Sequence, residues 1–437
     1  MKWALYNLLF AAVYPLLLPG FLLRMCRRGG YAARFLDRFA IYPEEVMREF
    51  RGALGGHDDF VPSEFVWIHA VSVGEVQVAG QLMREWRRVE PGVRFCFSTT
   101  SSTGWRMAER ELGERDRLIY NPLDFPSFVK SALRTVRPRA IVLTESEIWP
   151  NFILKARKYG IPLFLINARV SDRSAPRYAR ARWFFRDVFG AFTRIFAQSE
   201  LDAGRIRAAA GGAAVDIAVT GSFKFDVARR NEAKERELAE WVGDGFVLLG
   251  GSTWPGEDRV LLDIYRRILA MGLLRPTVLV IAPRHFEKAD EVEANIRAAG
   301  FTCRRRSRGD RDGEVRLCDT TGELMGLYGV ADAVFVGKSL CAHGSQNMIE
   351  PCLCGKPTFV GPYTENFRPV MSDLKAADAV IEVADARELA DRLLALVERG
   401  GDAALGERAR AAVLRRQGVV PKCVAAIREC LAAKGGR

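Results

Sequence analysis

The sequence is poor in the patterns that bind metals or form disulfide frameworks. Its 437 residues include four histidines and nine cysteines, without a Cys-x-x-Cys pair or a helical His-x-x-x-His pair. An odd number of scattered cysteines argues against a disulfide framework, and the sparse histidines argue against a structural zinc site. We therefore expect free thiols in a reducing compartment, no cofactor and no bound metal ion.

Other sequence signatures are missing as well. No Gly-x-x-x-x-Gly-Lys-Ser/Thr segment occurs, which disfavours a P-loop kinase or ATPase. No recognised nucleic-acid module is present, so we expect no nucleic-acid partner. What the chain does have is an excess of positive charge, with 65 Lys and Arg against 53 Asp and Glu and a formal net charge of +12. This excess suits a phosphate-bearing lipid or an anionic membrane surface.

A long apolar segment opens the chain. Residues 3–25 are long enough to cross a bilayer, although Pro15 and Pro19 interrupt them. The segment ends in bulky residues instead of a small-residue cleavage site, so we expect an uncleaved anchor. A spanning helix is favoured here over one that lies in the membrane interface.

Basic residues flank this segment unevenly. Lys2 alone precedes it, and five arginines follow at positions 24, 27, 28, 34 and 38. Positive charge stays on the cytoplasmic side, so we expect the body of the protein there. Residues 177–196 interleave arginines with aromatics, a pattern that fits either a phospholipid-binding surface or a helix whose aromatic side is core.

From residue 65 onward, short apolar runs alternate with helix-compatible stretches, and the pattern restarts in the second half. Such alternation predicts parallel sheets covered on both faces, here in two doubly wound α/β domains joined by a charged linker near residues 222–245. The predicted division is an anchor over 1–28, one domain over 29–225 and another over 226–437. The predicted strands are 65–71, 95–100, 140–145, 162–167, 194–199, 246–253, 277–283, 315–319, 333–337 and 357–361.

The first candidate site follows the strand over 65–71, in the segment HAVSVGEV. Gly74 is expected to allow a tight turn and a close approach of substrate, and Ser72 lies beside it. Glu75 opens the next helix, where it fits either a general base in a cleft or a first-turn carboxylate that binds helix amides.

A second pair of carboxylates follows the strand over 140–145. Alternation along the strand end predicts that Glu145 and Glu147 share one face and can hold a proton or a substrate hydroxyl. The alternative is an exposed pair at a strand terminus, and spacing alone slightly favours that alternative.

Candidates for binding an anion lie in the second half. Arg284 ends a predicted strand, where its guanidinium fits a phosphate and His285 can donate to the same anion. After the strand over 333–337, free amides at a helix start near Asn347 predict a nucleotide-phosphate site, with Glu350 one turn later on the ribose. Helix capping by Ser345 and Asn347 explains the same residues without a ligand.

The order of several segments resembles the bacterial Kdo (3-deoxy-D-manno-octulosonic acid) transferases. The matching segments span roughly residues 65–370 and occur in the family's order. They are HAVSVGEV, STTSSTGW, YNPLDFP, TESEIWPN, NARVSDRS, AQSELDAGRI, TGSFKFD, GGSTWPGED, IAPRHFEK and GSQNMIEPCLCGKPTFVGPYTENF.

This resemblance implies a GT-B fold, with two Rossmann-like domains facing a central cleft behind an N-terminal membrane-anchor helix. It implies inverting, metal-independent transfer of Kdo from CMP-Kdo to the lipid A precursor, lipid IVA, at the cytoplasmic face of the inner membrane. The residues it assigns are Glu75 as the general base, Glu145 as a second acidic residue, and Arg284, Asn347 and Glu350 on the CMP side. The further candidates for substrate contact in the matching segments are Ser72, Gly74, Lys224, Ser252, Thr253, His285 and Ser345.

The chain departs from this family at one position and leaves two rivals open. Lys338 stands where the family usually has a second glycine, and it either adds a phosphate contact or points to solvent. The rival functions are another GT-B transferase of lipopolysaccharide assembly, such as a heptosyltransferase or a lipid A disaccharide synthase, and a membrane-surface binding protein without catalysis.

Overall fold

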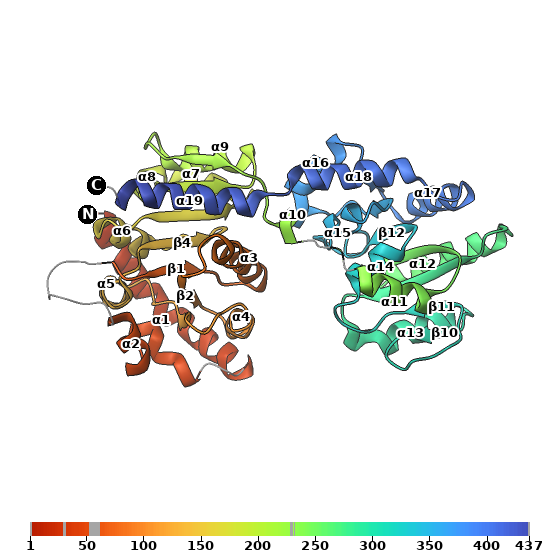
Figure 1. The fold of residues 1–437 in the computed structure, drawn as a ribbon, viewed down its shortest axis with the longest axis horizontal. Helices are drawn as coiled ribbons and strands as arrows, with labels where there is room; N and C mark the ends of the chain where they lie inside the picture. The colour runs from red at the N-terminus through yellow and green to blue at the C-terminus, as the bar shows by residue number, and fades with distance from the viewer. Residues whose placement is uncertain (1, 29–31, 52–61, 228–229, 231, 436–437) are drawn as a thin grey trace. The chain divides into compact units, whose positions relative to one another are not determined.

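The structure is a computed structural model that describes residues 2–28, 32–51, 62–227, 230 and 232–435. The chain divides into two compact units, the first formed by Met1–Phe223 with Gly418–Arg437 and the second by Lys224–Gln417 (Figure 1). The last twenty residues, which the sequence analysis placed in the C-terminal domain, thus belong to the first unit. They form α19 (Val419–Gly435), whose residues Val419, Cys423 and Ile427 join the core of that unit.

The first unit is built on a seven-stranded parallel sheet with the order β3-β2-β1-β4-β5-β6-β7. Side chains of successive strand residues point to opposite faces, and both faces are covered by helices. Trp67 of β1 therefore joins one hydrophobic core, while Val66 and Ile68 join the other. The strands are β1 (Phe65–His69), β2 (Arg94–Thr99), β3 (Arg117–Tyr120), β4 (Ala140–Thr144), β5 (Leu163–Ala168), β6 (Arg194–Ala197) and β7 (Ile217–Val219).

Helices connect and cover these strands. Besides α19, they are α1 (Lys2–Arg28), η1 (Ala32–Phe39), α2 (Glu44–Arg51), α3 (Val73–Val89), α4 (Ser102–Ala108), α5 (Pro126–Val136), α6 (Pro150–Lys158), α7 (Ala175–Arg180), α8 (Arg182–Phe189) and α9 (Glu200–Ala210). Residues 177–196 thus contribute to α7, α8 and β6. Their aromatic residues divide: Phe189 is buried in the core, whereas Trp183 is 56% exposed.

The second unit repeats the plan with a parallel sheet of order β10-β11-β9-β8-β12-β13-β14. Two cores again cover its faces, with Val247 and Leu249 of β8 in one and Phe246 and Leu248 in the other. Its strands are β8 (Phe246–Thr253), β9 (Thr277–Pro283), β10 (Cys303–Arg305), β11 (Val315–Leu317), β12 (Ala333–Val336), β13 (Thr358–Val360) and β14 (Ile381–Glu382).

The helices of this unit are α10 (Lys224–Val227), α11 (Glu232–Val242), α12 (Glu257–Ala270), η2 (Phe286–Lys288), α13 (Ala289–Ala298), α14 (Leu324–Val330), α15 (Ile349–Leu353), η3 (Glu365–Phe367), α16 (Arg368–Ala376), α17 (Ala386–Glu398) and α18 (Ala403–Arg416). The stretch predicted as a linker near residues 222–245 is largely helical. Leu238, Trp241 and Val242 of α11 are buried in the core of the second unit, so apolar residues spaced along a charged helix outweigh its linker-like composition.

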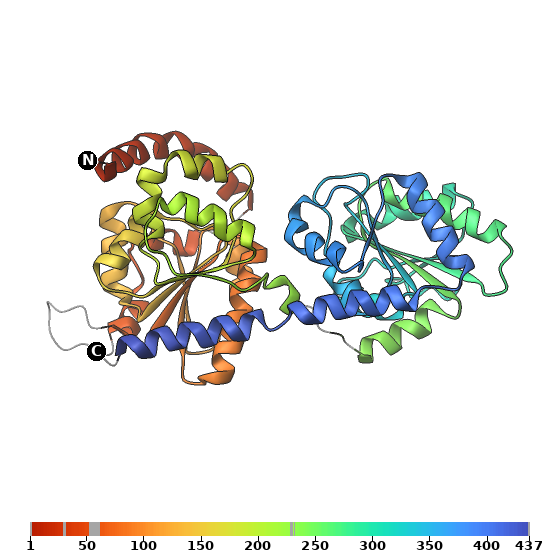
Figure 2. The same cartoon turned by 90° about the horizontal axis from the view of Figure 1, so that it is seen from above.

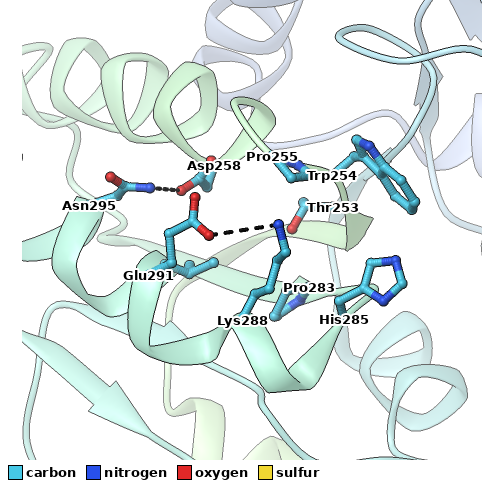
Figure 3. Close-up of a pocket in the computed structure, with 10 residues that line it drawn as sticks. Thr253, Trp254, Pro255, Asp258, Pro283, His285, Lys288, Glu291 and Asn295 are labelled. Atoms are coloured by element: carbon cyan, nitrogen blue, oxygen red, sulfur yellow. Dashed lines mark hydrogen bonds and ion pairs between the residues drawn. The ribbon is translucent and has the colours of Figure 1, made fainter.

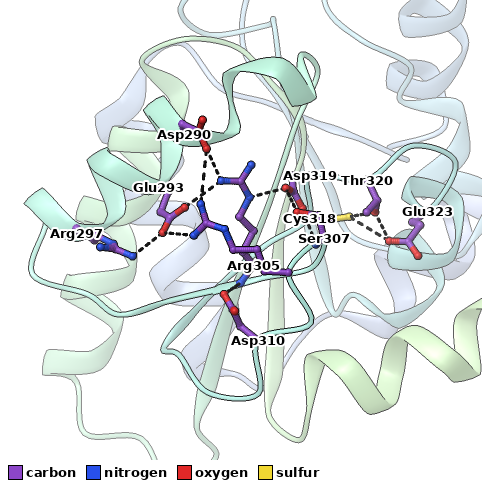
Figure 4. A network of polar contacts seen from close by, with 11 residues as sticks. Asp290, Glu293, Arg297, Arg305, Ser307, Asp310, Cys318, Asp319, Thr320 and Glu323 are labelled. Carbon is purple, nitrogen blue, oxygen red and sulfur yellow. Dashed lines mark hydrogen bonds and ion pairs between the residues drawn. The ribbon is translucent and has the colours of Figure 1, made fainter.

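Ion pairs fasten the β10 edge of the second sheet to the helices around it (Figure 4). The Arg305 guanidinium contacts Asp290 and Glu293 of α13 and Asp319 after β11, with Nε 2.5 Å from Asp319 Oδ2. Glu323 accepts hydrogen bonds from Arg306 and Thr320 and pairs with Lys234 of α11 at 2.7 Å. These short edge strands thus depend on charged side chains as well as on their backbone pairing.

The N-terminal helix α1 packs lengthwise on the first unit, beside α8 (Figure 2). The rings of Trp3 and Tyr6 lie 4.7 and 5.5 Å from the ring of Phe184, and the Tyr6 hydroxyl donates a 2.9 Å hydrogen bond to the buried Asp124. We call the residues that make such contacts the inward stripe: Trp3, Tyr6, Asn7, Phe10 and Tyr14.

Apolar side chains on the rest of α1 face solvent and form the outward stripe: Leu5, Leu8, Leu9, Val13 and Leu16, each at least 47% exposed. In the described part of the chain, no helix combines the length and apolar character that a bilayer crossing needs. The spanning helix expected over residues 3–25 gains no support from this finding. The side chains of residues 17, 18 and 21–33 lie outside the described part of the structure, and with them Arg24, Arg27 and Arg28 of the orientation prediction. Arg34 instead pairs with Asp37, and Arg38 donates to the Thr100 carbonyl.

Candidate functional site

Glu75 lies in the first turn of α3 and is held by three hydrogen-bond donors. Its carboxylate accepts from the backbone N–H of Val71 at 3.0 Å, the Ser72 hydroxyl at 2.9 Å and the Thr144 hydroxyl at 3.2 Å. Ser72 in turn caps the helix by accepting from the Glu75 N–H. This arrangement resembles a capping box, so the helix-end explanation of Glu75 is correct as far as it goes. The same bonds also hold the carboxylate rigidly, at 9% exposure, beside the open start of a helix.

Gly74 differs from its predicted role. It has no positive φ angle, and a Cβ atom built there would meet only Ser72 Oγ, at 4.0 Å. A tight turn is therefore not the reason for a glycine here. The space above the helix start is open, and a small residue leaves room for a substrate to approach Glu75.

Behind Glu75, polar side chains that sequence reasoning did not single out connect β1, β2 and β4. The buried Thr144 hydroxyl also lies 3.0 Å from the carbonyl oxygen of His69. The His69 ring is fully buried, with Nδ1 2.9 Å from Ser98 Oγ and Nε2 3.6 Å from a carboxylate oxygen of Glu147. Polar residues at the ends of adjacent buried strands are the signal that could have drawn attention to them.

Glu145 and Glu147 are not related by strand alternation. Strand β4 ends at Thr144, and Glu145 adopts a left-handed φ of +49°, which turns the chain away. The Glu145 carboxylate accepts from Asn167 Nδ2 at 3.1 Å, whereas Glu147 binds the Trp149 indole N–H and approaches His69. The predicted shared proton between the two carboxylates is therefore not supported by their contacts.

In the second unit, one buried carboxylate organises the loop after β12. Glu257, at the start of α12, is fully buried and accepts the backbone N–H of Trp254 at 2.7 Å and of Lys338 at 2.8 Å. It also accepts the next three amides of that loop, at 3.1 to 3.4 Å. Consecutive amides of this kind form an anion site, and here a residue of the chain itself occupies it. Glu257 could not be singled out from the sequence because the loop amides that it binds lie more than eighty residues away.

Backbone conformation is unusual around this loop. Ser252, Lys338 and Ser345 all have left-handed φ angles, of +53°, +57° and +58°. Residues with a Cβ rarely adopt this conformation. It persists where surrounding contacts enforce it, which is often at functional sites. Two of the three were predicted as donor-binding residues, so the structure places them in one strained region.

Arg284, Asn347 and Glu350 come together as predicted. Asn347 Nδ2 donates to Glu350 Oε1 at 3.0 Å. Burial raises the pKa of Glu350, and the Asn347 hydrogen bond and the positive charge of Arg284 oppose that rise. Among the residues the structure describes, no salt bridge engages the Arg284 guanidinium. An exposed guanidinium beside a carboxylate fits a phosphate next to a sugar hydroxyl.

The predicted helix-start phosphate site differs in detail. Helix α15 begins only at Ile349 and has five residues, and the Ile349 N–H is accepted by Asn347 Oδ1 at 3.1 Å. Ser345 does not cap it, because its hydroxyl donates to the Gln346 carbonyl. With the Ile349 amide engaged and the preceding loop bound to Glu257, side chains become the main candidates for phosphate contact.

Thr253 and His285 line a small pocket at the carboxyl ends of β8 and β9 (Figure 3). Asn295 donates to Asp258 at 2.6 Å across one wall, and Lys288 lies 3.8 Å from Glu291 across another. Trp254 also lines the pocket, and its ring centroid lies 4.9 Å from that of His285. The pocket thus adjoins the predicted donor residues.

Lys224 contacts the segment that follows β13. Its Nζ is 3.3 Å from the Asn366 carbonyl oxygen and 4.0 Å from the centre of the Phe367 ring. Asn366 packs against Gly344 of the loop after β12, so Lys224 reaches the far side of that loop. Within the described ranges, no cluster of three or more His, Cys, Asp or Glu side chains is arranged to hold a metal ion.

Comparison with known proteins identifies the family. Residues 33–227 match the family model of 3-deoxy-D-manno-octulosonic-acid transferase (kdotransferase). The 3-deoxy-D-manno-octulosonic acid transferase of Bordetella pertussis is 34% identical over 414 residues, covering 88% of this chain and 95% of that protein. That of Haemophilus influenzae is 31% identical over 395 residues, covering 88% of both.

The fold agrees with this relationship. The crystal structure of Anabaena HepE in complex with UDP covers 85% of this chain and 100% of its own, with a TM-score of 0.58 and 16% identity. At that identity the likeness concerns the fold alone, two parallel-sheet α/β domains of the GT-B class. With a family match over the first unit and two relatives above 30% identity along most of its length, the chain belongs to the Kdo transferases, the glycosyltransferases of lipopolysaccharide core biosynthesis.

Proposed function

We propose that the protein transfers Kdo from CMP-Kdo to the lipid A precursor lipid IVA, with inversion and without a metal ion. In this reaction an acceptor hydroxyl attacks the anomeric carbon of Kdo and loses its proton to Glu75. The bond between that carbon and the phosphate oxygen breaks, and CMP leaves with the electron pair. Attack opposite the leaving group needs one base and no covalent nucleophile, which accounts for inversion.

The observation that carries the proposal is the setting of Glu75. Three donors from Val71, Ser72 and Thr144 hold its carboxylate in one orientation at the open start of α3. A general base works best when it is already oriented toward the hydroxyl that it deprotonates. Glu145 supports this end of the unit through Asn167, whose side-chain oxygen also accepts the Phe223 N–H.

The donor side relies on the second unit. In the proposed mechanism, Arg284 stabilises the phosphate that leaves with CMP, and Glu350 accepts hydrogen bonds from the ribose. The hydrogen bond from Asn347 to Glu350 and the charge of Arg284 beside it support these roles. Glu257 supports the site by fixing the loop that begins at Lys338. Because protein cations are available to balance the phosphate charge, the mechanism requires no metal ion.

The surface of α1 supports the proposed acceptor and location. Its outward stripe presents leucines to solvent while its inward stripe fastens the helix to the body. The adjacent α7 and α8 add the exposed side chains of Arg177, Arg180, Arg182 and Trp183. Leucines beside arginines and a tryptophan suit an anionic phospholipid surface. We therefore place α1 in the interface of the inner membrane, with the protein on its cytoplasmic side and within reach of a lipid acceptor.

The test is CMP release from CMP-Kdo, with and without tetraacylated lipid A precursor, in the presence of EDTA. We expect release that depends on the acceptor, survives the chelator and falls by about two to four orders of magnitude in Glu75→Gln. Glu85→Gln, later in the same helix, is the matched control and should retain activity. NMR of the product should show the anomeric configuration opposite to that of the donor. If folded wild type releases no CMP, the donor assignment is wrong, and UDP- and ADP-sugars should be tried.

A further inference from the structure

Lys338 combines a strained backbone with a positive charge in the middle of the donor loop. Its φ of +57° is in the left-handed region, where a residue with a Cβ costs about 1 kcal/mol more than glycine. The conformation is enforced from both sides, because its N–H donates to Glu257 at 2.8 Å and its carbonyl oxygen accepts from the Ser345 N–H at 2.7 Å. A side chain kept at such a position calls for a reason beyond packing.

The fixed backbone directs the side chain over an aromatic ring. Lys338 Nζ lies 4.8 Å from the centre of the Trp254 ring, and Trp254 contacts His285. These residues follow β12, β8 and β9, which are neighbours in the sheet. The ammonium group therefore lies at the carboxyl ends of the strands, where ligands of such sheets bind.

The Lys338 ammonium has no carboxylate in salt-bridge contact among the residues that the structure describes. In the described part of the chain, Lys338 makes no salt bridge, and the same holds for Arg284 on the strand two places away in the sheet. The Trp254 ring positions the cation but leaves its N–H groups available to an anion. Lys338 and Arg284 thus place two cations on either side of β8, at one end of the sheet.

We propose that Lys338 is a donor-binding residue that contacts an anionic oxygen of the sugar nucleotide; this rests on the proposed function. CMP-Kdo carries two negative groups, the phosphate diester and the carboxylate of the sugar. Arg284 and Lys338 supply two cations, so the charges match in number. Trp254 acts as a positioning residue that holds the ammonium in place.

The experiment compares Lys338→Gly, Lys338→Met and Lys338→Arg in the full-length protein. Calorimetry would measure the affinity for CMP and for CMP-Kdo, and thermal unfolding would report stability. Asp378→Gly is the matched control, because Asp378 also has a left-handed φ, of +46°, in a turn elsewhere in the second unit. Both glycine variants relieve strain, but only one removes a charge from the donor site.

We expect Lys338→Gly and Lys338→Met to bind CMP-Kdo about tenfold more weakly, the loss of one charge-assisted contact. Lys338→Gly should do so without losing thermal stability, which separates binding from folding, and Lys338→Arg should keep most of the affinity. Weaker binding of CMP as well assigns the contact to the phosphate, and an effect on CMP-Kdo alone assigns it to the carboxylate.

Unchanged affinity for both ligands in Lys338→Gly and Lys338→Met overturns the proposal while leaving the transferase function intact. Wild type that binds neither CMP nor CMP-Kdo overturns the donor assignment, and the proposal with it. The donor KM should follow the same order as the affinities, with the KM for the lipid acceptor unchanged.

Discussion

The hydroxyl of Thr144 lies 3.2 Å from Oε2 of Glu75 and joins the end of β4 to the start of α3. Thr144 is fully buried, and its single hydroxyl hydrogen is shared between Glu75 and the His69 carbonyl oxygen. Thr144→Val keeps the branched shape and removes this donor. We expect kcat for CMP release to fall about tenfold, the effect of one lost hydrogen bond to a charged group. Thr144→Ser keeps the hydroxyl and should stay near wild type; a fully active valine variant would contradict the positioning role.

Glu257→Gln should weaken donor binding by loosening the loop after β12. In the wild type, two carboxylate oxygens accept the backbone N–H groups of the loop. The glutamine side chain has a single oxygen to accept them, and its NH₂ group would face further N–H donors. We expect a loss of about 2 kcal/mol in unfolding free energy and a higher donor KM, measured by urea denaturation and by CMP release. Asp258→Asn, the next residue of α12, is the control, because its contacts are to Asn295 and Gly256. Equal effects of the two substitutions on the donor KM would argue against a special role of Glu257.

Arg284→Gln should change the pH dependence of CMP binding. Burial raises the pKa of Glu350 and the charge of Arg284 opposes the rise, so removing that charge should raise the pKa further. In the proposed site, the Glu350 carboxylate accepts hydrogen bonds from the ribose hydroxyls more strongly than its protonated form would. Binding should therefore weaken as the pH falls through the pKa of Glu350. We expect the midpoint of this loss to move to higher pH in Arg284→Gln and to stay in place in Arg284→Lys. Calorimetric titrations with CMP at a series of acidic pH values measure this midpoint. A midpoint that is the same in Arg284→Gln and wild type would disprove the charge interaction between Arg284 and Glu350.

Acid should remove part of the stability of the second unit. Burial alone would raise the pKa of Glu323, but hydrogen bonds from Arg306, Lys234 and Thr320 outweigh it and lower the pKa to about 2. A depressed pKa in the folded state adds stability that is complete above the unfolded value, about 4.3, and is lost as the pH falls toward 2.

Glu323→Gln should therefore lower the unfolding free energy by about 2 kcal/mol at pH 7, with the difference from wild type shrinking below about pH 4. Glu382→Gln, which removes the partner of Lys375 at the surface, serves as the control with a small effect. Denaturant unfolding of both variants and wild type at a series of pH values measures this effect. If the difference in unfolding free energy between Glu323→Gln and wild type does not depend on pH, the stabilising role of the Glu323 carboxylate is refuted.

Charges placed on the outward stripe of α1 should release the protein from membranes. Leu9 and Leu16 are 55% and 80% exposed, so replacing both by glutamate disturbs no packed core. We expect at least a tenfold loss of binding to vesicles of phosphatidylglycerol and phosphatidylcholine, with unchanged thermal stability. Leu274→Glu, at a fully exposed leucine of the second unit, should bind as wild type does. Vesicle binding that survives the double substitution would exclude α1 as the contact.

The local pattern of apolar residues was sufficient to predict most of the strands. The ten predicted strands all appear, because buried parallel strands are continuous apolar runs that need no distant information to recognise. The strands that escaped, β3, β7, β10 and β14, have two to four residues each, too few to show a period. The place of Glu75 after β1 was likewise evident, since ligands of such sheets bind at strand ends.

The sequence by itself therefore determined two α/β domains, the family, and the order in which Glu75 follows β1, Arg284 follows β9 and Glu350 follows β12. Only the tertiary structure decided that α1 lies along the body, that Glu257 binds amides more than eighty residues away, and that Lys338 is held left-handed over Trp254. The physical reason is that burial along a strand is a local property of neighbouring residues. Hydrogen bonds and charges instead depend on which distant segments the fold brings within a few ångströms of each other.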